Sequence, residues 1–206
     1  RYDSAMTYAK KGYQLAAQLQ DDYFINLNKI NRAAVLSTGG FYSQAEDLML
    51  AMDVEKMSPK LLQYYYYTLT WVYNYWETFC NKSEFQEGLA AKKRFYLGKT
   101  LEHIGNKESA LYYYLSGEVE YLKQRTSKKT LQFYMKALSA SPLNSRVYAS
   151  SAYCIARYYY DTDQKDLYEK YIVEAAISDQ ICPLKENLAL QEFSTYLYNK
   201  DASYAK

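Results

Sequence analysis

The chain has 206 residues, of which 49% are hydrophobic and 23% are charged, and its 25 basic and 23 acidic residues give a net charge of +2. This near balance argues against a nucleic-acid-binding protein, which normally carries a basic excess on one face. No apolar run approaches the ~20 residues that span a bilayer, so we expect no membrane segment in this region.

The spacing of apolar residues predicts α-helices along the whole chain. In residues 60–80, Leu62 and Tyr66 begin one stripe at helical spacing, and Leu61 and Tyr65 begin a second stripe beside it. A helix with two adjoining apolar stripes packs against neighbours on two sides, as an inner helix of a stacked array does. The 27 tyrosines suit such half-buried faces, because each has a large ring and a polar hydroxyl group. With only 7 glycines and 3 prolines, the chain has little turn chemistry for a many-stranded sheet.

Breaks between the helical segments divide the chain into pairs of helices. Ser58 and Ser83 offer hydroxyl groups that can cap the helices that follow them, and Pro59 fits a first helical turn. In chain order we expect a half repeat over residues 1–20, repeats over about 22–56, 59–104, 107–141 and 144–178, and a half repeat over 183–206.

Two fragments indicate which repeat this is. Gly40, Tyr42 and Ala45 give a glycine turn followed by an aromatic and a small residue, and Ala137 and Pro142 close a later helix. Together they resemble the turn and second helix of a tetratricopeptide (TPR) repeat, whose period is about 34 residues. The resemblance implies an all-α fold: a single TPR-like domain over residues 1–206, built as a right-handed α-α superhelix of about ten antiparallel helices. The chain departs from the pattern at residue 125, where an arginine stands in place of the turn glycine.

The C-terminal third is similar to a particular group of TPR proteins, from gram-negative gut anaerobes. The similarity is most specific between Tyr134 and Tyr198, in the runs around residues 171–179 and 185–198. In that group, an exported TPR region is followed by a membrane helix and a cytoplasmic regulatory tail. The sequence begins inside one predicted helix and ends as another begins, so we expect a fragment of a longer protein. The resemblance implies that it is the sensory or interaction region of a periplasmic, membrane-tethered regulator. It implies no catalytic residues.

The sequence offers little material for catalysis, so we expect a protein that is not an enzyme and that uses no cofactor or metal. His103 is the single histidine and lies near the end of a helix, where the helix dipole favours it. Cys80, Cys154 and Cys182 lack the spacing of metal ligands, and we expect buried free thiols. A Cys154–Cys182 disulfide is the alternative in an oxidising compartment.

A binding function has more support. In a TPR array the first helix of each pair lines a concave groove, and such a groove suits an extended protein or peptide ligand. Transferred to this chain, that register predicts a ligand-binding surface formed by Thr70, Tyr73, Asn74, Arg146, Tyr153, Arg157, Asn187, Ser194 and Tyr198. For the tyrosines in this set, packing between helices is the competing interpretation.

Two alternatives to a peptide-binding scaffold stay open. One is a glycan-binding domain of a nutrient-uptake system, which predicts an exposed Trp71 or Trp76 beside carboxylates. The other is a passive spacer that forms a homodimer through the repeat surface.

Overall fold

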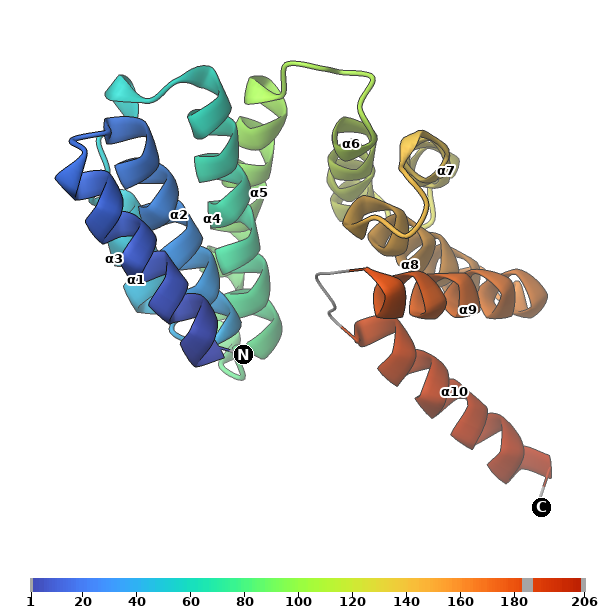
Figure 1. Cartoon of the computed structure of the whole chain (residues 1–206). Helices are drawn as coiled ribbons and strands as arrows, with labels where there is room; N and C mark the ends of the chain where they lie inside the picture. The colour runs from blue at the N-terminus through green and yellow to red at the C-terminus, as the bar shows by residue number, and fades with distance from the viewer. Residues whose placement is uncertain (1, 183–186, 205–206) are drawn as a thin grey trace. The chain divides into compact units, whose positions relative to one another are not determined.

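The computed structural model describes residues 2–182 and 187–204, and every regular element in those ranges is a helix (Figure 1). This confirms the predicted fold class, an all-α stack of the TPR type. The chain falls into two compact units, residues 1–105 and residues 106–206. The single-domain organisation and the repeat boundaries remain predictions, and residues 183–186 of the last half repeat lie outside the described ranges.

The first unit is a stack of helices in which short turns reverse the chain. Its elements are α1 (Tyr2–Gln18), α2 (Asp22–Thr38), α3 (Tyr42–Leu50), the 3-10 helix η1 (Val54–Lys56), α4 (Pro59–Phe79) and α5 (Ser83–His103). Each α-helix packs against the next one, and α2 also packs against α4. Contact between the first helices of successive hairpins is the arrangement of a helical repeat.

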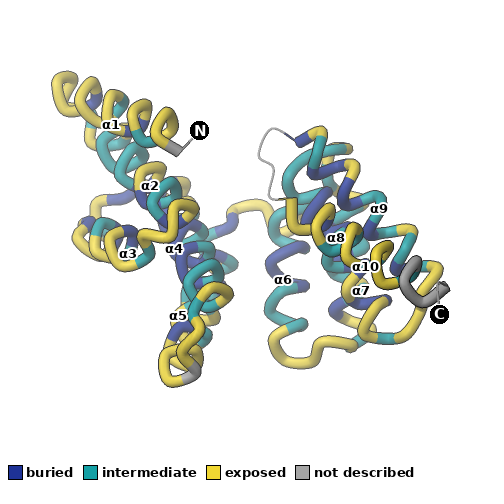
Figure 2. The backbone as a smooth tube through the Cα atoms, turned by 90° about the horizontal axis from the view of Figure 1, so that it is seen from below, coloured by how far each residue is buried: buried dark blue, intermediate teal, exposed yellow. Residues whose placement is uncertain are grey.

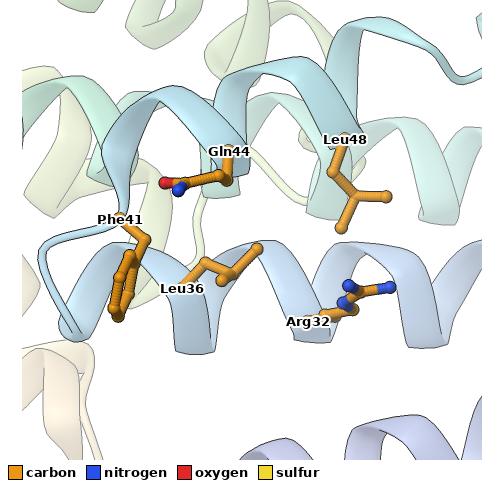
Figure 3. Close-up of a pocket in the computed structure, with 5 residues that line it drawn as sticks. All are labelled: Arg32, Leu36, Phe41, Gln44 and Leu48. Atoms are coloured by element: carbon orange, nitrogen blue, oxygen red, sulfur yellow. The ribbon is translucent and has the colours of Figure 1, made fainter.

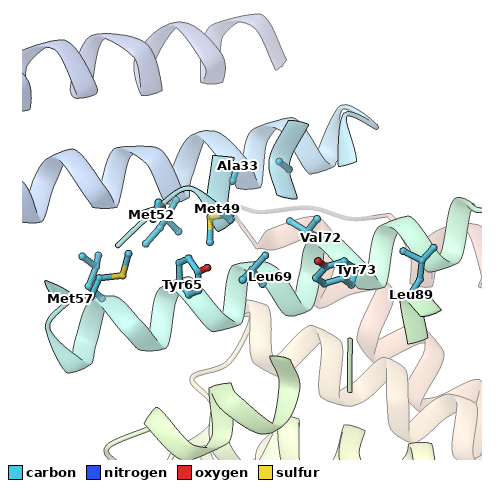
Figure 4. Packing of buried hydrophobic residues seen from close by; sticks show 12 residues of the cluster. Ala33, Met49, Met52, Met57, Tyr65, Leu69, Val72, Tyr73 and Leu89 are labelled. Atoms are coloured by element: carbon cyan, nitrogen blue, oxygen red, sulfur yellow. The ribbon is translucent and has the colours of Figure 1, made fainter. Parts of the chain in front are cut away.

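Apolar side chains from α2, α3 and α4 meet in the core of the first unit (Figure 4). Ala33 of α2 and Met49 of α3 are fully buried, and Leu69 of α4 lies against them in the same cluster. The small residue lets α2 approach its neighbours closely, and the flexible methionine fills the irregular space that remains. Figure 2 shows that buried residues follow the helix faces that meet within each unit.

A glycine turn joins α2 to α3 as predicted. Gly40 has a φ of 83°, a left-handed conformation that glycine adopts without strain. The Gly40 N–H bonds the Ser37 carbonyl at 3.2 Å, and the Phe41 N–H bonds the Leu36 carbonyl at 3.0 Å. These two bonds form a Schellman motif, which places the residues at its two ends, Leu36 and Phe41, next to each other.

Serine hydroxyl groups cap several helices by accepting a backbone N–H of the first turn. The capping residues are Ser58, Ser109, Ser127 and Ser145. Pro59 occupies the first turn of α4, as expected. The cap expected at Ser83 is corrected, because α5 begins at Ser83 and the residue at the N-cap position is Lys82.

The second unit continues the same construction. Its helices are α6 (Ala110–Lys123), α7 (Lys128–Ala140), α8 (Arg146–Asp161), α9 (Lys165–Ile181) and α10 (Leu188–Tyr204). Consecutive helices pack together, and α6 also contacts α8. Among the buried residues that fill this unit are Leu115, Tyr134, Ala152, Ile155, Tyr168 and Ile172.

One close approach in the second unit depends on glycine. A Cβ atom on Gly117 of α6 would lie 2.5 Å from the ring of Tyr134 on α7. Tyr134 is only 1% exposed, so its ring lies in the packed interior, where a shift disturbs other contacts. The missing side chain at residue 117 therefore lets α6 and α7 close around the tyrosine.

Candidate functional site

Tyrosine hydroxyl groups donate hydrogen bonds to glutamates of neighbouring helices in both units. The pairs are Tyr73–Glu46, Tyr134–Glu118, Tyr148–Glu174, Tyr153–Glu192 and Tyr196–Glu169. The bond to Glu174 raises the pKa of Tyr148 to about 12, because an ionised phenol would face a carboxylate. These five tyrosines therefore join helices, and their hydroxyl groups are already engaged.

The predicted site residues of the first unit are mostly buried. Tyr73 is 0% exposed, its hydroxyl group donates to Glu46, and Lys92 lies over its ring. Thr70 is also buried, and its hydroxyl group lies 3.3 Å from that of Thr100 on α5. Thr70 and Tyr73 therefore pack inside the unit and do not line an open groove. Asn74 is half-buried, and of the three it is the most accessible.

Asp179 brings two predicted residues of the second unit together. This buried carboxylate accepts a bond from the Arg146 guanidinium at 2.9 Å and from the Asn187 backbone N–H at 2.7 Å. Asn187 lies just before α10, so the bonds tie the start of α10 to α8 and α9. In this arrangement the Arg146 guanidinium is engaged within the unit.

Tyr153 and Arg157 lie one turn apart on α8 and form a combined aromatic and cationic surface. The Tyr153 hydroxyl group donates to Glu192 of α10 at 2.6 Å, and the Arg157 guanidinium lies 6.0 Å from the centre of the Tyr153 ring. Arg157 is exposed and, among the residues described, forms no ion pair. Burial acts to lower the pKa of Arg157, but Tyr153, Tyr121 and Glu192 outweigh burial and raise it. The guanidinium group therefore has polar neighbours within the unit, while the residue keeps an exposed edge.

A second pair of this kind lies on α6 and just beyond it, where sequence reasoning did not place a site. The Arg125 guanidinium lies 5.5 Å from the centre of the Tyr121 ring, and Arg125 is exposed. Burial raises the pKa of Tyr121, whereas both Arg157 and Arg125 act to lower it, so both cations lie near its hydroxyl group. The signal that could have revealed this pair is the repeated spacing, a tyrosine followed one turn later by an arginine.

The last two predicted residues lie on α10 and are exposed. Tyr198 is 75% exposed, and the Ser194 hydroxyl group donates to the Leu190 carbonyl at 2.8 Å. We name the surface formed by Tyr121, Arg125, Tyr153 and Arg157 the tyrosine–arginine surface. Glu192 connects it to α10, but no described contact joins Ser194 or Tyr198 to it.

The described residues offer little reactive chemistry. They contain no cluster of histidine, cysteine and acidic side chains suited to a metal ion, and no helix that is both long and apolar enough to cross a bilayer. The His103 Nδ1 atom lies 2.9 Å from the Lys99 carbonyl oxygen at the end of α5. Cys154 and Cys182 are both free, and burial raises the pKa of the Cys154 thiol, which lies 3.5 Å from Glu118.

A separate cavity of about 310 Å³ lies between α2 and α3 in the first unit (Figure 3). Its lining residues are Arg32, Leu36, Phe41, Gln44 and Leu48. The leucines and the phenylalanine form an apolar wall, and the arginine and the glutamine add hydrogen-bond donors. This site does not include any of the residues predicted from the sequence.

Comparisons with known proteins agree with this architecture. The family model described as "SusR N-terminal TPR domain" matches residues 1–205. A similar solved structure is the crystal structure of BtubC (BKLC) from P. vanneervenii, with a TM-score of 0.58 and 18% sequence identity, covering 87% of this chain and 74% of that chain. At this identity the likeness concerns the fold alone. No curated protein sequence matches the chain.

Proposed function

The chain belongs to the SusR N-terminal TPR domain family, and we propose that it is a non-catalytic scaffold that binds a protein or peptide. We propose further that it is the sensory or interaction region of a periplasmic, membrane-tethered regulator. This second step is supported by the resemblance of residues 134–198 to exported TPR regions of such regulators.

The observation that carries the binding proposal is the tyrosine–arginine surface. One pair lies on α6 and just beyond its end, and the other lies on α8. α6 and α8 contact each other and are the first helices of successive hairpins. In helical repeats the first helices present a continuous ligand surface, so two equivalent pairs in adjacent repeats form one extended surface. A ligand that spans this surface can contact two tyrosine–arginine pairs, one in each repeat.

The chemistry of this surface favours an acidic peptide. A guanidinium group has five N–H donors and no acceptor, and it binds a carboxylate through two parallel hydrogen bonds. Each arginine already lies over a tyrosine ring, so less side-chain freedom is lost when a ligand binds. Glu192 accepts the Tyr153 hydroxyl hydrogen bond and lies near Arg157 without forming a direct ion pair with it among the described residues, so an acidic ligand adds a closer charge partner.

The glycan-binding alternative predicts an exposed tryptophan, and neither tryptophan is exposed. Trp76 is half-buried, and its ring stacks on Tyr42 at 5.9 Å and on Tyr73 at 6.3 Å between centroids. Trp71 is also half-buried and contacts the rings of Tyr67 and Tyr75. A sugar-binding platform needs an aromatic face that is open to solvent.

A titration with a fluorescein-labelled peptide of alternating glutamate and alanine tests the proposal. We expect saturable binding to the 206-residue chain that weakens as salt rises, because exposed charges are screened. The double variant Arg125→Gln/Arg157→Gln should weaken binding by about tenfold or more, since two charge-assisted contacts are lost. The control is Arg94→Gln, an exposed arginine of α5, which should bind as the natural chain does. Equal affinity for the double variant and the control would contradict the proposal.

A further inference from the structure

The cavity between α2 and α3 is built by the turn that joins these helices. The Schellman bonds of the turn place Phe41 beside Leu36, and both residues line the cavity. Leu48 completes the apolar wall from α3, and Figure 3 shows the side chains of both helices facing this space. The backbone of the turn thus determines where the apolar end of this open cavity lies.

The polar groups of the cavity select a ligand by charge. Arg32 is exposed, it lies at the Leu48 end of the cavity, and it forms no ion pair with any residue that the structure describes. Gln44 is also exposed and contributes an amide group that can donate hydrogen bonds. A carboxylate complements both groups, whereas an amine or a second guanidinium group is repelled by Arg32.

The packing of the same hairpin indicates the form of the ligand. α4 covers one flank of the α2–α3 hairpin by packing against both helices, with Leu61 and Tyr65 directed into the core. A helix is thus the element that fills a groove between two helices in this fold. The cavity lies on another flank, where the half-buried Leu36 and Leu48 are left accessible.

The spacing of the lining residues indicates how far apart the apolar and the acidic group of the ligand should be. Arg32 and Leu36 are one turn apart on α2, and Gln44 and Leu48 are one turn apart on α3. We propose that this cavity docks an amphipathic helix of a partner protein, which places a leucine-sized side chain against Leu36, Phe41 and Leu48 and a carboxylate one turn away against Arg32. The inference rests on the proposed function in that the ligand is a protein segment, but it uses a site distinct from the tyrosine–arginine surface.

The test uses the 206-residue chain and a defined helical probe. The probe is an N-acetylated, C-amidated, alanine-based peptide that carries leucine and glutamate one turn apart, with two control peptides in which glutamine replaces glutamate or alanine replaces leucine. NMR titration should give saturable shifts of the Gln44 side-chain amide and of the Leu36 and Leu48 methyl groups. Arg32→Gln should weaken binding by about fivefold, as expected when a charge-assisted bond to an exposed group is lost. Both control peptides should bind more weakly than the probe.

A matched variant separates this site from general charge effects. Arg94→Gln removes an exposed positive charge from α5 in the same unit and should leave the affinity of the probe unchanged. The NMR shifts of Leu36, Gln44 and Leu48 report on this cavity alone, whereas the fluorescein titration reports on the tyrosine–arginine surface. The inference and the proposed function can therefore fail independently. The inference is overturned if the shifts do not saturate, if Arg32→Gln binds as well as Arg94→Gln, or if the glutamine peptide binds as well as the probe. It is equally overturned if sedimentation shows a dimer that Arg32→Gln dissociates, since the occupant is then a second copy of this chain.

Discussion

The hydroxyl group of Tyr153 donates a hydrogen bond to the carboxylate of Glu192 at 2.6 Å, which joins α8 to α10. Both helices also pack against α9, so the bond closes a triangle of three helices. Burial, together with the charge of Glu192, raises the pKa of Tyr153 above its ordinary value, and the hydroxyl group stays protonated at neutral pH. The bond fixes the tyrosine ring over which Arg157 lies, and so it links the packing of the unit to the proposed binding surface.

Replacing Tyr153 by phenylalanine should destabilise the second unit by about 1 kcal/mol, because Glu192 loses a hydrogen-bond partner in a half-buried position. Urea unfolding followed by circular dichroism measures this change. The control is Tyr198→Phe, since Tyr198 is 75% exposed and its change should be close to zero. Equal stability of the two variants would show that the Tyr153–Glu192 bond contributes nothing to the fold.

Gly117→Ala should destabilise the chain although alanine is the better helix former. The added Cβ would lie 2.5 Å from the buried Tyr134 ring, and overpacking of this kind costs about 1–3 kcal/mol. At Gly88 of α5 a Cβ meets nothing within 4 Å, so Gly88→Ala should raise stability by about 0.5–1 kcal/mol. Thermal unfolding of both variants gives the comparison, and a shift of the same sign in both would contradict the close approach of α6 and α7.

Arg146→Ala should cost about 3 kcal/mol, because it leaves the Asp179 carboxylate buried without its cation. Asp179→Asn is expected to cost less, since an amide oxygen still accepts the Asn187 N–H. The exposed pair Lys56–Asp53 is the control, and Lys56→Ala should leave the free energy of unfolding almost unchanged, because solvent screens an exposed pair. A small effect of Arg146→Ala would mean that the buried pair is not formed in solution.

The free energy of unfolding of the first unit should decrease at low pH, in part because Glu46 becomes protonated. Burial alone would raise the pKa of this carboxyl group, but the hydrogen bonds from Lys92 and Tyr73 outweigh burial and lower it below 4.5. A carboxyl group whose pKa is lower in the folded state contributes stability above its unfolded pKa, and this contribution is lost as the pH falls through the folded pKa. Unfolding midpoints measured from pH ~7 down to pH ~3 should therefore decrease less steeply for Glu46→Gln than for the natural chain. Identical slopes would argue against the Glu46–Lys92–Tyr73 contact.

The fold was predictable because its signals are local. The helical spacing of apolar residues, the glycine turn at Gly39-Gly40 and the proline at residue 59 each act within a few residues, and each is found where the pattern indicated. The register of a single helix face was harder to assign. Residues 60–80 carry two adjoining apolar stripes, so Tyr73 could be assigned to a groove although it lies fully buried beside Glu46.

The sites were less predictable because they depend on which faces stay uncovered. Arg125 stands at a position where the repeat normally has a turn glycine, so the repeat pattern assigns it to a turn and gives no sign of its contact with Tyr121 one turn before. The cavity lies on the flank of α3 that α4 does not cover. The residue spacing within 41–50 does not indicate which flank of this helix a neighbouring helix will cover. Arg157 was predicted from the register of the first helix in a TPR pair, and the structure places it on an exposed position of α8. Its part in ligand binding stays a prediction.

Site-specific photocrosslinking in cells tests the central claim, that the tyrosine–arginine surface binds a protein partner. The photoreactive residue p-benzoylphenylalanine is placed at position 121 of α6 and, as a control, at position 95 of α5, where Phe95 is 57% exposed. We predict a covalent adduct with a partner protein from position 121 that is lost in the Arg125→Gln/Arg157→Gln background, and no such adduct from position 95. No adduct from position 121, or an adduct that persists in the double variant, would contradict the account.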